Sequence, residues 1–267
     1  DMNRPLGPQI SDAEIIINGF TKLDRATLEM CPKLFLVHQA GIGYDNVDLD
    51  YCNSKSIKVA NVPLANSIAV AEHTLFLMIY LAKNIQAAPG TLLKRRIAGV
   101  MGSELYGKTL LVIGLGSSGT EVAKRAKAFG MKVLAITKDP IIGISNKPGW
   151  EKPYSADEIK GPESLKEYLS LADYVSLHLP LNHETEGLIG RPELELMKES
   201  AYLVNVARGP IVDKEALFNA LTGRSIAGAA FDVFWDEPAN PDDRILKLEN
   251  FVLTPHIAGW TRESVEA

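Results

Sequence analysis

The sequence predicts an α/β protein built on a doubly wound parallel sheet, with a second and smaller parallel α/β unit ahead of it. Two observations lead to this prediction. Short apolar runs, typical of strands buried on both faces, alternate with helix-like segments along the 267 residues. The alternation is interrupted once, by a long apolar helix, and restarts more strongly from Thr109.

The smaller unit occupies residues 1–66. Its expected strands are the apolar runs at 14–17, 34–37 and 57–60. Residues 66–88 then predict one long helix, because apolar side chains recur there at helical spacing. Pro89 and Gly90 are expected to end this helix, since both residue types interrupt helices.

The second part of the chain carries the stronger alternation. Its expected strands are 109–113, 131–136, 173–178, 201–206, 226–232 and 251–253. Its expected helices are 119–129, 164–171, 192–198 and 213–222. Six strands with intervening helices are the expected content of a doubly wound domain. Residues 139–161 are rich in Lys, Pro and Gly, which predicts a surface loop.

The composition excludes several classes of partner. Apolar residues make up 46% and charged residues 23%, the ordinary balance of a globular protein with a real core. A net charge of −5 argues against a nucleic-acid or anionic-membrane surface, and the longest apolar stretch, 74–82, is too short to cross a bilayer. Cys31 and Cys52 lack metal-type spacing and fit a reducing compartment. We therefore expect a cytoplasmic protein without a metal site.

A G-x-G-x-x-G turn lies between a predicted strand and a predicted helix, the context that a dinucleotide site requires. Gly114 permits the tight turn, Gly116 lets the backbone approach a pyrophosphate, and Gly119 lets helix and strand pack closely. The helix N-terminus supplies amides and a partial positive charge for the anion. The turn therefore predicts a Rossmann-type cofactor site, and a simple strand–helix connection is the alternative.

The end of the next strand distinguishes NAD from NADP. An NAD site places an Asp or Glu roughly 20 residues after the glycines, where it binds the ribose hydroxyls. In this chain Thr137 lies 18 residues after Gly119, and Lys138 follows it. A hydroxyl and an ammonium group suit a 2′-phosphate, so NADP(H) is expected to be favoured. NAD(H) is the alternative, with Asp139 supplying the carboxylate.

Arg208, Glu237 and His256 follow three successive predicted strands, and the carboxyl ends of parallel strands meet at one edge of a sheet. Arg208 can bind a substrate carboxylate bidentately and polarise a keto oxygen. His256 can exchange a proton near neutral pH, and Glu237 can bind its other ring nitrogen and favour the imidazolium. This set predicts reversible reduction of a 2-oxo acid. Singly, the three could be a surface arginine, a loop carboxylate and a strand-end histidine.

The order and spacing of seven stretches resemble those of the D-isomer-specific 2-hydroxyacid dehydrogenase family, which includes 3-phosphoglycerate dehydrogenase, glyoxylate/hydroxypyruvate reductase and D-lactate dehydrogenase. The stretches are 41–48, 66–73, 114–119, 176–181, 205–213, 232–238 and 255–259. Together they are far more specific than any one motif. The resemblance implies the same roles for Arg208, Glu237 and His256 that their chemistry suggests.

The resemblance also implies a domain order. In the family, the dinucleotide-binding domain is inserted into a smaller, flavodoxin-like substrate domain. Here residues 1–66 correspond to the substrate domain, 67–260 to the dinucleotide-binding domain, and 261–267 to the start of the return to the substrate domain. Relatives carry further segments beyond both ends, so this chain is expected to be truncated at each terminus.

Further site residues follow from the resemblance. Those expected to bind the substrate carboxylate through backbone amides are Gly41, Ile42 and Gly43. Those expected at the cofactor are Ser117 and Ser118 on the pyrophosphate, Pro180 beside the adenine and Asp232 at the nicotinamide or its ribose. His73 and Glu72, on the long helix, are expected to be structural.

The expected partner is a small-molecule 2-oxo or 2-hydroxy acid, and no feature of the sequence selects which one. The long helix and the family both suggest a homodimer. Two other readings stay open. The chain could be an NAD(P)-responsive binding protein like the dehydrogenase-related corepressors, or it could be an inactive paralogue.

Overall fold

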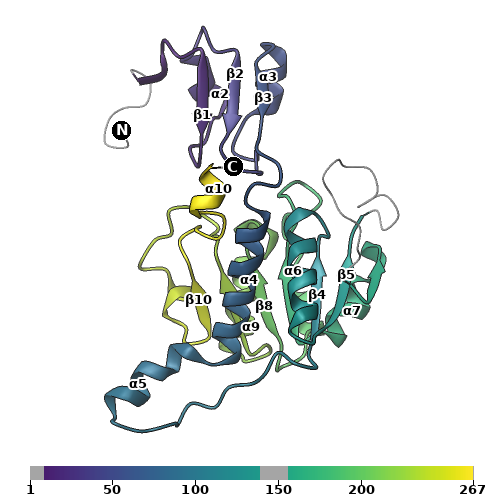
Figure 1. Cartoon of the computed structure of the whole chain (residues 1–267). Coiled ribbons are helices and arrows are strands. Elements are labelled where there is room, and N and C mark those ends of the chain that lie inside the picture. Colours follow the sequence, from purple (N-terminus) through teal and green to yellow (C-terminus); the bar gives the residue numbers. More distant parts are fainter. Residues whose placement is uncertain (1–8, 139–155, 267) are drawn as a thin grey trace. The chain divides into compact units, whose positions relative to one another are not determined.

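The computed structural model describes residues 9–138 and 156–266, and the chain divides into two compact units (Figure 1). Unit 1 comprises Asp1–Asn66 and Glu263–Ala267, and unit 2 comprises Ser67–Arg262. Helix α10 (Arg262–Glu266) begins in unit 2 and continues into unit 1. The assignment of these units as a substrate domain and a dinucleotide-binding domain stays a prediction.

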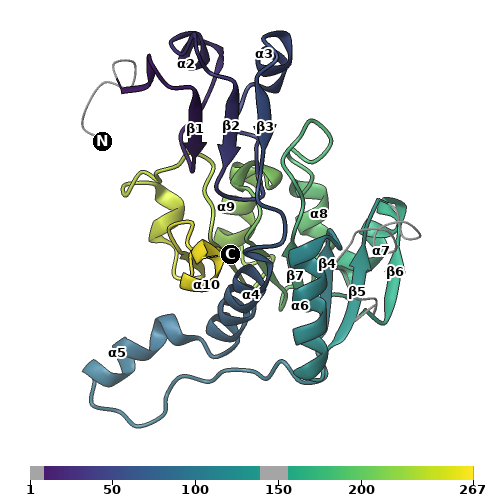
Figure 2. The same ribbon diagram turned by 45° about the horizontal axis from the view of Figure 1, so that its top comes forward.

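Unit 1 contains a parallel sheet of three strands in the order β1-β2-β3 (Figure 2). The elements are β1 (Ile15–Asn18), α2 (Arg25–Glu29), β2 (Leu36–Gln39), α3 (Leu49–Ser54) and β3 (Lys58–Ala60). Asp24 and Asp48 begin the helices, because each carboxylate accepts a hydrogen bond from an amide three residues further on. Strand β2 starts two residues later than predicted and ends on Gln39. Its buried amide pairs with Asn18 of β1 at 2.7 Å, a polar contact that an apolar pattern does not reveal.

Unit 2 is built on a parallel sheet in the order β10-β9-β8-β7-β4-β5-β6. The strands are β4 (Thr109–Ile113), β5 (Lys132–Ile136), β6 (Glu158–Lys160), β7 (Tyr174–Leu177), β8 (Tyr202–Asn205), β9 (Gly228–Phe231) and β10 (Phe251–Leu253). The order reverses at β4, which has β5 on one side and β7 on the other. The predicted doubly wound fold is therefore confirmed. The crevice at such a reversal is where ligands bind in open α/β sheets.

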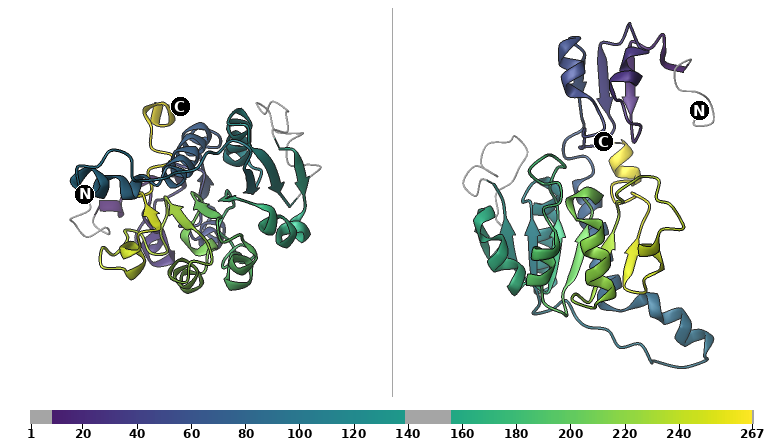
Figure 3. Two further views of the ribbon diagram at one scale, coloured as in Figure 1. Left: turned by 90° about the horizontal axis from the view of Figure 1, so that it is seen from below. Right: turned by 180° about the vertical axis from the view of Figure 1, so that it is seen from behind.

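Helices cover both faces of this sheet (Figures 1 and 3). One face carries α4 (Ser67–Ala82) and α6 (Ser117–Ala128), and the other carries α7 (Leu165–Leu171), α8 (Arg191–Leu196) and α9 (Lys214–Thr222). Successive residues of a strand point to opposite faces, so Val112 packs in the cluster with α4 and α6, while Leu111 packs with the other three helices. Because both faces of the sheet are buried, its central strands have nearly continuous apolar sequences.

Strand β6 corrects the sequence prediction in two ways. The sheet has seven strands rather than six, and part of the loop predicted at 139–161 is a strand at the edge of the sheet. Ile159 is the one apolar residue of β6, so no apolar run signals the strand. The rest of the predicted loop, residues 139–155, lies outside the residues that the structure describes.

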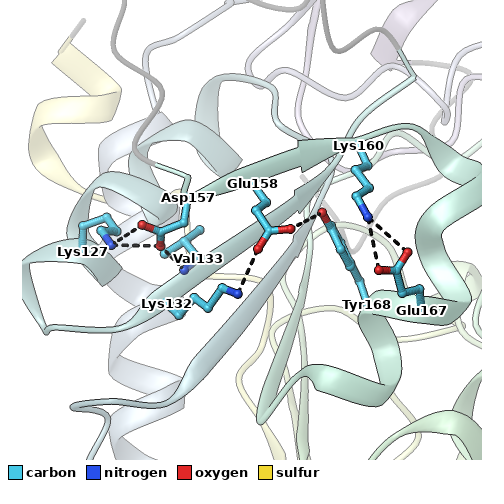
Figure 4. A network of polar contacts seen from close by, with 8 residues as sticks. All are labelled: Lys127, Lys132, Val133, Asp157, Glu158, Lys160, Glu167 and Tyr168. Carbon is cyan, nitrogen blue, oxygen red and sulfur yellow. Dashed lines mark hydrogen bonds and ion pairs between the residues drawn. The ribbon is translucent and has the colours of Figure 1, made fainter.

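Charged side chains hold this edge in place (Figure 4). Glu158 pairs with Lys132 of β5 at 2.9 Å and accepts a hydrogen bond from the hydroxyl of Tyr168 at 3.2 Å. Lys160 pairs with Glu167 of α7 at 3.1 Å and lies over the ring of Tyr168. Charged residues suit an edge strand, because they discourage pairing with another chain.

The long helix predicted at 66–88 is shorter and broken. Helix α4 ends at Ala82, Asn84 adopts a left-handed backbone with φ of 49°, and the chain continues into η1 (Ile85–Ala87) and α5 (Ala88–Leu93). The prediction that Pro89 and Gly90 end a helix is wrong, because both lie within α5, and Pro89 lies in its first turn, where its missing N–H is not needed. Among the described residues, no single helix combines the length and apolar character of a membrane span. Helix α4 and the bent continuation Ile85–Leu93, at 57°, meet those two requirements only as a pair.

Candidate active site

Three loops at neighbouring strand ends of unit 2 carry Arg208, Glu237 and His256. They follow β8, β9 and β10, which lie next to one another in the sheet. Gly209 lets the first two loops approach closely, since a Cβ on it would lie 2.2 Å from the carbonyl oxygen of Phe234. Any other residue would push the loops apart. The structure thus gathers the three predicted residues at one edge of the sheet, while their catalytic roles stay predictions.

His256 and Glu237 form a hydrogen-bonded pair. His256 Nδ1 lies 2.7 Å from Glu237 Oε2, and Glu237 Oε1 accepts the amide hydrogen of Phe234 at 2.9 Å. Burial acts to raise the pKa of Glu237, but its hydrogen bonds to His256 and Phe234 and the charges of His256 and Arg208 outweigh burial and lower it. An ionised carboxylate can only accept, so His256 Nδ1 carries the hydrogen of this bond. Nε2 is then the ring nitrogen suited to exchanging a proton with a substrate.

The turn that carries Arg208 is fixed through its backbone. Asn205, fully buried at the end of β8, donates from Nδ2 to the carbonyl oxygen of Arg208 at 2.8 Å. Its Oδ1 accepts the amide hydrogen of Ala207 at 3.0 Å. The guanidinium donates to the carbonyl oxygen of Ala207 at 2.7 Å, and its charge acts on Glu237. The geometry of this turn is therefore set by Asn205, with a further hydrogen bond from the arginine side chain.

Asp232, buried at the end of β9, organises the loop that carries His256. The amide of His256 donates to its carbonyl oxygen at 2.7 Å, and the amides of Ile257 and Ala258 donate to Oδ1 at 3.0 Å and Oδ2 at 2.7 Å. His256 itself has a φ of 55°, which for a residue with a Cβ requires about 1–3 kcal/mol of support from its surroundings. The sequence did not predict that Asp232 organises this loop. The predicted contact of Asp232 with a nicotinamide stays a prediction.

The glycine turn has the geometry that a pyrophosphate site needs. Gly114 has a φ of 99°, and a Cβ on it would lie 2.4 Å from the carbonyl oxygen of His178 on the neighbouring loop. A Cβ on Gly119 would lie 2.0 Å from the carbonyl oxygen of Gly114, so helix α6 packs directly on the turn. A Cβ on Gly116 would meet nothing within 4 Å, and Gly116, the N-cap residue of α6, provides no side-chain cap for the amides that begin the helix. These residues fit a dinucleotide, because open space and helix-end amides coincide.

His178 directly follows β7, beside the glycine turn, and the sequence predicts a structural or cofactor-adjacent role for it. Its Nε2 is 2.7 Å from the hydroxyl of Ser176, and its Nδ1 is 3.3 Å from the hydroxyl of Ser118 on α6. Burial lowers the pKa of His178 to about 3, so the ring is neutral at pH 7. A neutral ring that bridges β7 and α6 helps to hold the turn without placing a positive charge in it.

The far end of the predicted cofactor site contains an ion pair. Thr137 follows β5, and the exposed Lys138 pairs with Glu184, which lies in the loop after β7. Pro180, also exposed, begins that loop, and its carbonyl oxygen accepts the hydroxyl of Thr185 at 2.6 Å. Sequence reasoning missed Glu184, because its distance from Lys138 along the chain gives no signal. Asp139 lies outside the described residues.

The loop 41–43 belongs to unit 1 and follows β2. Its three carbonyl oxygens are bound by the amide of Val62 at 3.2 Å, the side chain of Asn61 at 2.8 Å and the side chain of Gln39 at 2.9 Å. Within the described residues, the amides of Gly41, Ile42 and Gly43 donate no hydrogen bond to another backbone group. The loop is therefore held through its carbonyls and presents its amides.

The described part of the chain contains no group of three or more His, Cys, Asp and Glu side chains arranged to hold a metal ion. Cys31 and Cys52 are buried free thiols within unit 1.

The sequence is similar to that of known proteins of one family. The family model described as "D-isomer specific 2-hydroxyacid dehydrogenase, NAD binding domain" matches residues 75–258. The chain is 40% identical over 268 residues to a D-3-phosphoglycerate dehydrogenase of Methanocaldococcus jannaschii, an alignment that covers 97% of this chain and 48% of that protein. The chain thus spans about half the length of this curated relative.

Two solved structures resemble the whole fold. A D-lactate dehydrogenase from Aquifex aeolicus, in complex with NAD and lactic acid, has a TM-score of 0.84 at 33% identity and covers 99% of this chain and 82% of its own. An acyclic imino acid reductase, Bsp5, in complex with NADPH and D-Arg, has a TM-score of 0.82 at 30% identity and covers 97% and 80%. The family model over residues 75–258 and these relatives show that the chain belongs to the D-isomer specific 2-hydroxyacid dehydrogenase family.

Proposed function

We propose that the chain catalyses the NAD(P)-dependent interconversion of a 2-oxo acid and a D-2-hydroxy acid. The observation that carries this proposal is the 2.7 Å hydrogen bond between His256 Nδ1 and Glu237 Oε2, with the charge of Arg208 acting on the same carboxylate. A histidine oriented by an ionised carboxylate is a suitable proton donor and acceptor. Membership of the family supports the same class of reaction.

Each residue of the trio has a defined part in this proposal. In reduction, His256 gives the proton on Nε2 to the carbonyl oxygen, while Arg208 binds the substrate carboxylate and polarises the carbonyl. Glu237 stays ionised, orients the ring through Nδ1 and offsets its positive charge. When bound, the nicotinamide supplies the hydride. Oxidation uses the same groups in reverse, with His256 taking the proton.

Backbone amides are proposed to bind the anionic groups of both ligands. The amides of loop 41–43 suit a substrate carboxylate, because the carbonyls of that loop are already bound. The amides that begin α6, with Ser117 and Ser118, suit the pyrophosphate. Pro180 is proposed to lie beside the adenine, and Asp232 beside the nicotinamide or its ribose.

The proposal is tested by offering glyoxylate, hydroxypyruvate, pyruvate and 3-phosphohydroxypyruvate with NADH and with NADPH. Turnover of any of these acids supports it, and the products of the three acids other than glyoxylate, which alone gives an achiral product, should be the D-hydroxy acids on chiral analysis. Cofactor binding without turnover would contradict it and favour a corepressor-like binding protein or an inactive paralogue. The same panel identifies the substrate.

Glu237→Gln is expected to lower kcat roughly 100-fold, because a neutral amide no longer offsets the charge of the His256 ring. The hydrogen bond from the amide of Phe234 can persist in this variant, so the loop should keep its shape. Steady-state kinetics with saturating cofactor measure the loss. A kcat within about twofold of wild type would show that Glu237 does not support His256 in the reaction.

The same pair contributes to stability in a pH-dependent way. The pKa of Glu237 is lowered from an ordinary value of 4.5, so its contribution is complete above about pH 4.5 and is lost as the pH falls through the lowered value. The difference in free energy of unfolding between wild type and Glu237→Gln is therefore expected to persist at about pH 5 and to shrink in more acidic solution. Denaturant titrations at a series of pH values measure it.

Cofactor preference is proposed to depend on Glu184 as well as Lys138. Lys138 suits the 2′-phosphate of NADPH, but Glu184 neutralises it and would repel that phosphate. Glu184→Gln is expected to raise kcat/KM for NADPH about threefold to tenfold and to change that for NADH little, since both side chains are exposed. Glu186→Gln, in the same loop, is the matched control.

Two outcomes would contradict this account of cofactor choice. A wild-type preference for NADH of about tenfold or more would show that NADPH is not the favoured cofactor. An equal response of Glu184→Gln and Glu186→Gln would show that any effect comes from the net charge of the loop and not from the pair with Lys138.

A homodimer is also proposed. Helix α5 and the segment after it extend away from the sheet of unit 2 (Figure 1). They expose large apolar side chains. These are Leu92, Leu93, Ile97 and Met101, all at least 76% exposed. Apolar side chains gathered on one projecting segment are typical of an interface.

The cytoplasmic location predicted from the composition stays a prediction.

A further inference from the structure

Histidine 73 connects helix α4 to the loop that carries His256. Its Nε2 lies 2.9 Å from Thr254 Oγ1 and 3.4 Å from Asp232 Oδ1, and its side chain is 14% exposed. We infer that His73 is a positioning residue, which holds Thr254 and Asp232 so that the backbone between them presents His256 to the substrate. This inference rests on the proposed function and adds to it a residue on a different element of the fold.

The loop depends on Asp232 to an unusual degree. Three consecutive amides, from His256 to Ala258, donate to its carbonyl or carboxylate oxygens, and the hydroxyl of Thr254 donates to Oδ1 at 2.5 Å. His256 has a left-handed backbone, which residues with a Cβ adopt only when their surroundings impose it. The orientation of Asp232 therefore determines where the His256 ring lies. A group that holds Asp232 in place therefore also affects the position of the His256 ring, without contacting it.

Counting the hydrogens shows what His73 contributes. A threonine hydroxyl has one hydrogen, and in Thr254 the 2.5 Å contact to Asp232 uses it. Toward His73 this hydroxyl can only accept, so His73 Nε2 must carry a hydrogen. That N–H points at Thr254 and, less closely, at Asp232, both of which accept. His73 is thus the donor that fixes the direction of the Thr254 hydroxyl.

The ring of His73 is suited to this part because it is neutral. Burial lowers its pKa, although the negative charge of Asp232 works in the opposite direction. A neutral ring with the hydrogen on Nε2 provides one directed donor and leaves the charge of Asp232 for the loop amides. Helix α4 packs against α6, β8 and β9, so it gives the ring a rigid support.

Loss of the His73 donor should affect kcat more than cofactor binding. Without it, the Thr254 hydroxyl can turn away, Asp232 is held less firmly and the His256 backbone can relax. A displacement of the acid by up to about 1 Å lowers turnover by roughly 10- to 100-fold. The glycine turn lies at the end of β4 and uses none of these contacts, so the dissociation constant of the cofactor should change much less than kcat, by no more than the loss of the contact proposed between Asp232 and the nicotinamide or its ribose.

The experiment compares three substitutions of His73 with a control on the same helix. Glutamine can place its amide nitrogen near the position of Nε2, whereas asparagine reaches only the position of Nδ1 and leucine donates nothing. His73→Gln is expected to keep kcat within about threefold of wild type, while His73→Asn and His73→Leu lose roughly 10- to 100-fold. Glu72→Gln, at an exposed neighbour, should behave as wild type.

A second measurement separates this inference from the proposed function. Hydrogen exchange of the amides of His256, Ile257 and Ala258 in the full chain should be about tenfold faster in His73→Leu, and unchanged in His73→Gln and Glu72→Gln. If the wild type reduced no oxo acid, the proposed function would fail, and the exchange rates would still decide whether His73 holds the loop. Unchanged exchange in His73→Leu, or equal kcat in the glutamine and leucine variants, would overturn the inference.

Discussion

Replacing His256 by alanine is expected to lower kcat for oxo-acid reduction by roughly 100- to 10,000-fold, the range for removal of a general acid. The His256 ring is oriented by its hydrogen bond to the ionised Glu237, and alanine removes the ring nitrogen proposed to carry the proton. Steady-state kinetics with the best acid of the panel measure the loss.

Cofactor binding provides the control for this variant. The dissociation constant of NADPH or NADH should stay within about twofold of wild type, because the turn at Gly114, Gly116 and Gly119 does not involve His256. A His256→Ala variant that retains kcat within a few-fold would show that another group supplies the proton. Equal losses of turnover and of cofactor affinity would point to a collapsed loop instead.

Replacing Arg208 by glutamine is expected to lower kcat/KM by roughly 100- to 1,000-fold, because the variant loses both the carboxylate contact and the charge that polarises the carbonyl. The melting temperature should fall only modestly, since Asn205 still holds this turn through the carbonyl oxygen of residue 208, while the hydrogen bond from the guanidinium to Ala207 is lost. Activity and thermal unfolding are measured on the same preparation.

Arg208→Lys is the matched variant for this prediction. It keeps the positive charge but cannot bind a carboxylate bidentately, so it should recover only part of the lost kcat/KM. Full recovery by lysine would show that charge alone matters at this position. A loss of less than about tenfold in Arg208→Gln would contradict the role proposed for the arginine.

Buried parallel strands are the best-predicted part of this fold. Strands such as β4 and β8 are buried on both faces, so nearly every residue is apolar and the run itself marks the strand. Their carboxyl ends necessarily share one edge of the sheet. That is why the gathering of Arg208, Glu237 and His256 could be predicted from their places after three successive strands.

Strand β6 and the end of helix α4 were predicted poorly, for a common reason. Strand β6 has a single apolar residue and owes its place to pairing with β5 and to charged contacts such as Glu158 with Lys132. Helix α4 ends at Ala82 because Asn84 adopts a left-handed backbone, although the apolar pattern continues past it. In both cases contacts or backbone conformation, and not hydrophobic periodicity, set the boundary.

The sequence alone was enough to identify the doubly wound fold, the glycine turn and the three residues at the strand ends, because each depends on a local pattern or on strand order. Contacts between segments that lie far apart in the sequence are visible only in the tertiary structure. His73 lies 181 residues from Thr254, and Lys138 lies 46 residues from Glu184, yet each pair is in contact. Such pairs have no sequence signature, since their contact depends on how helices and loops pack around the sheet.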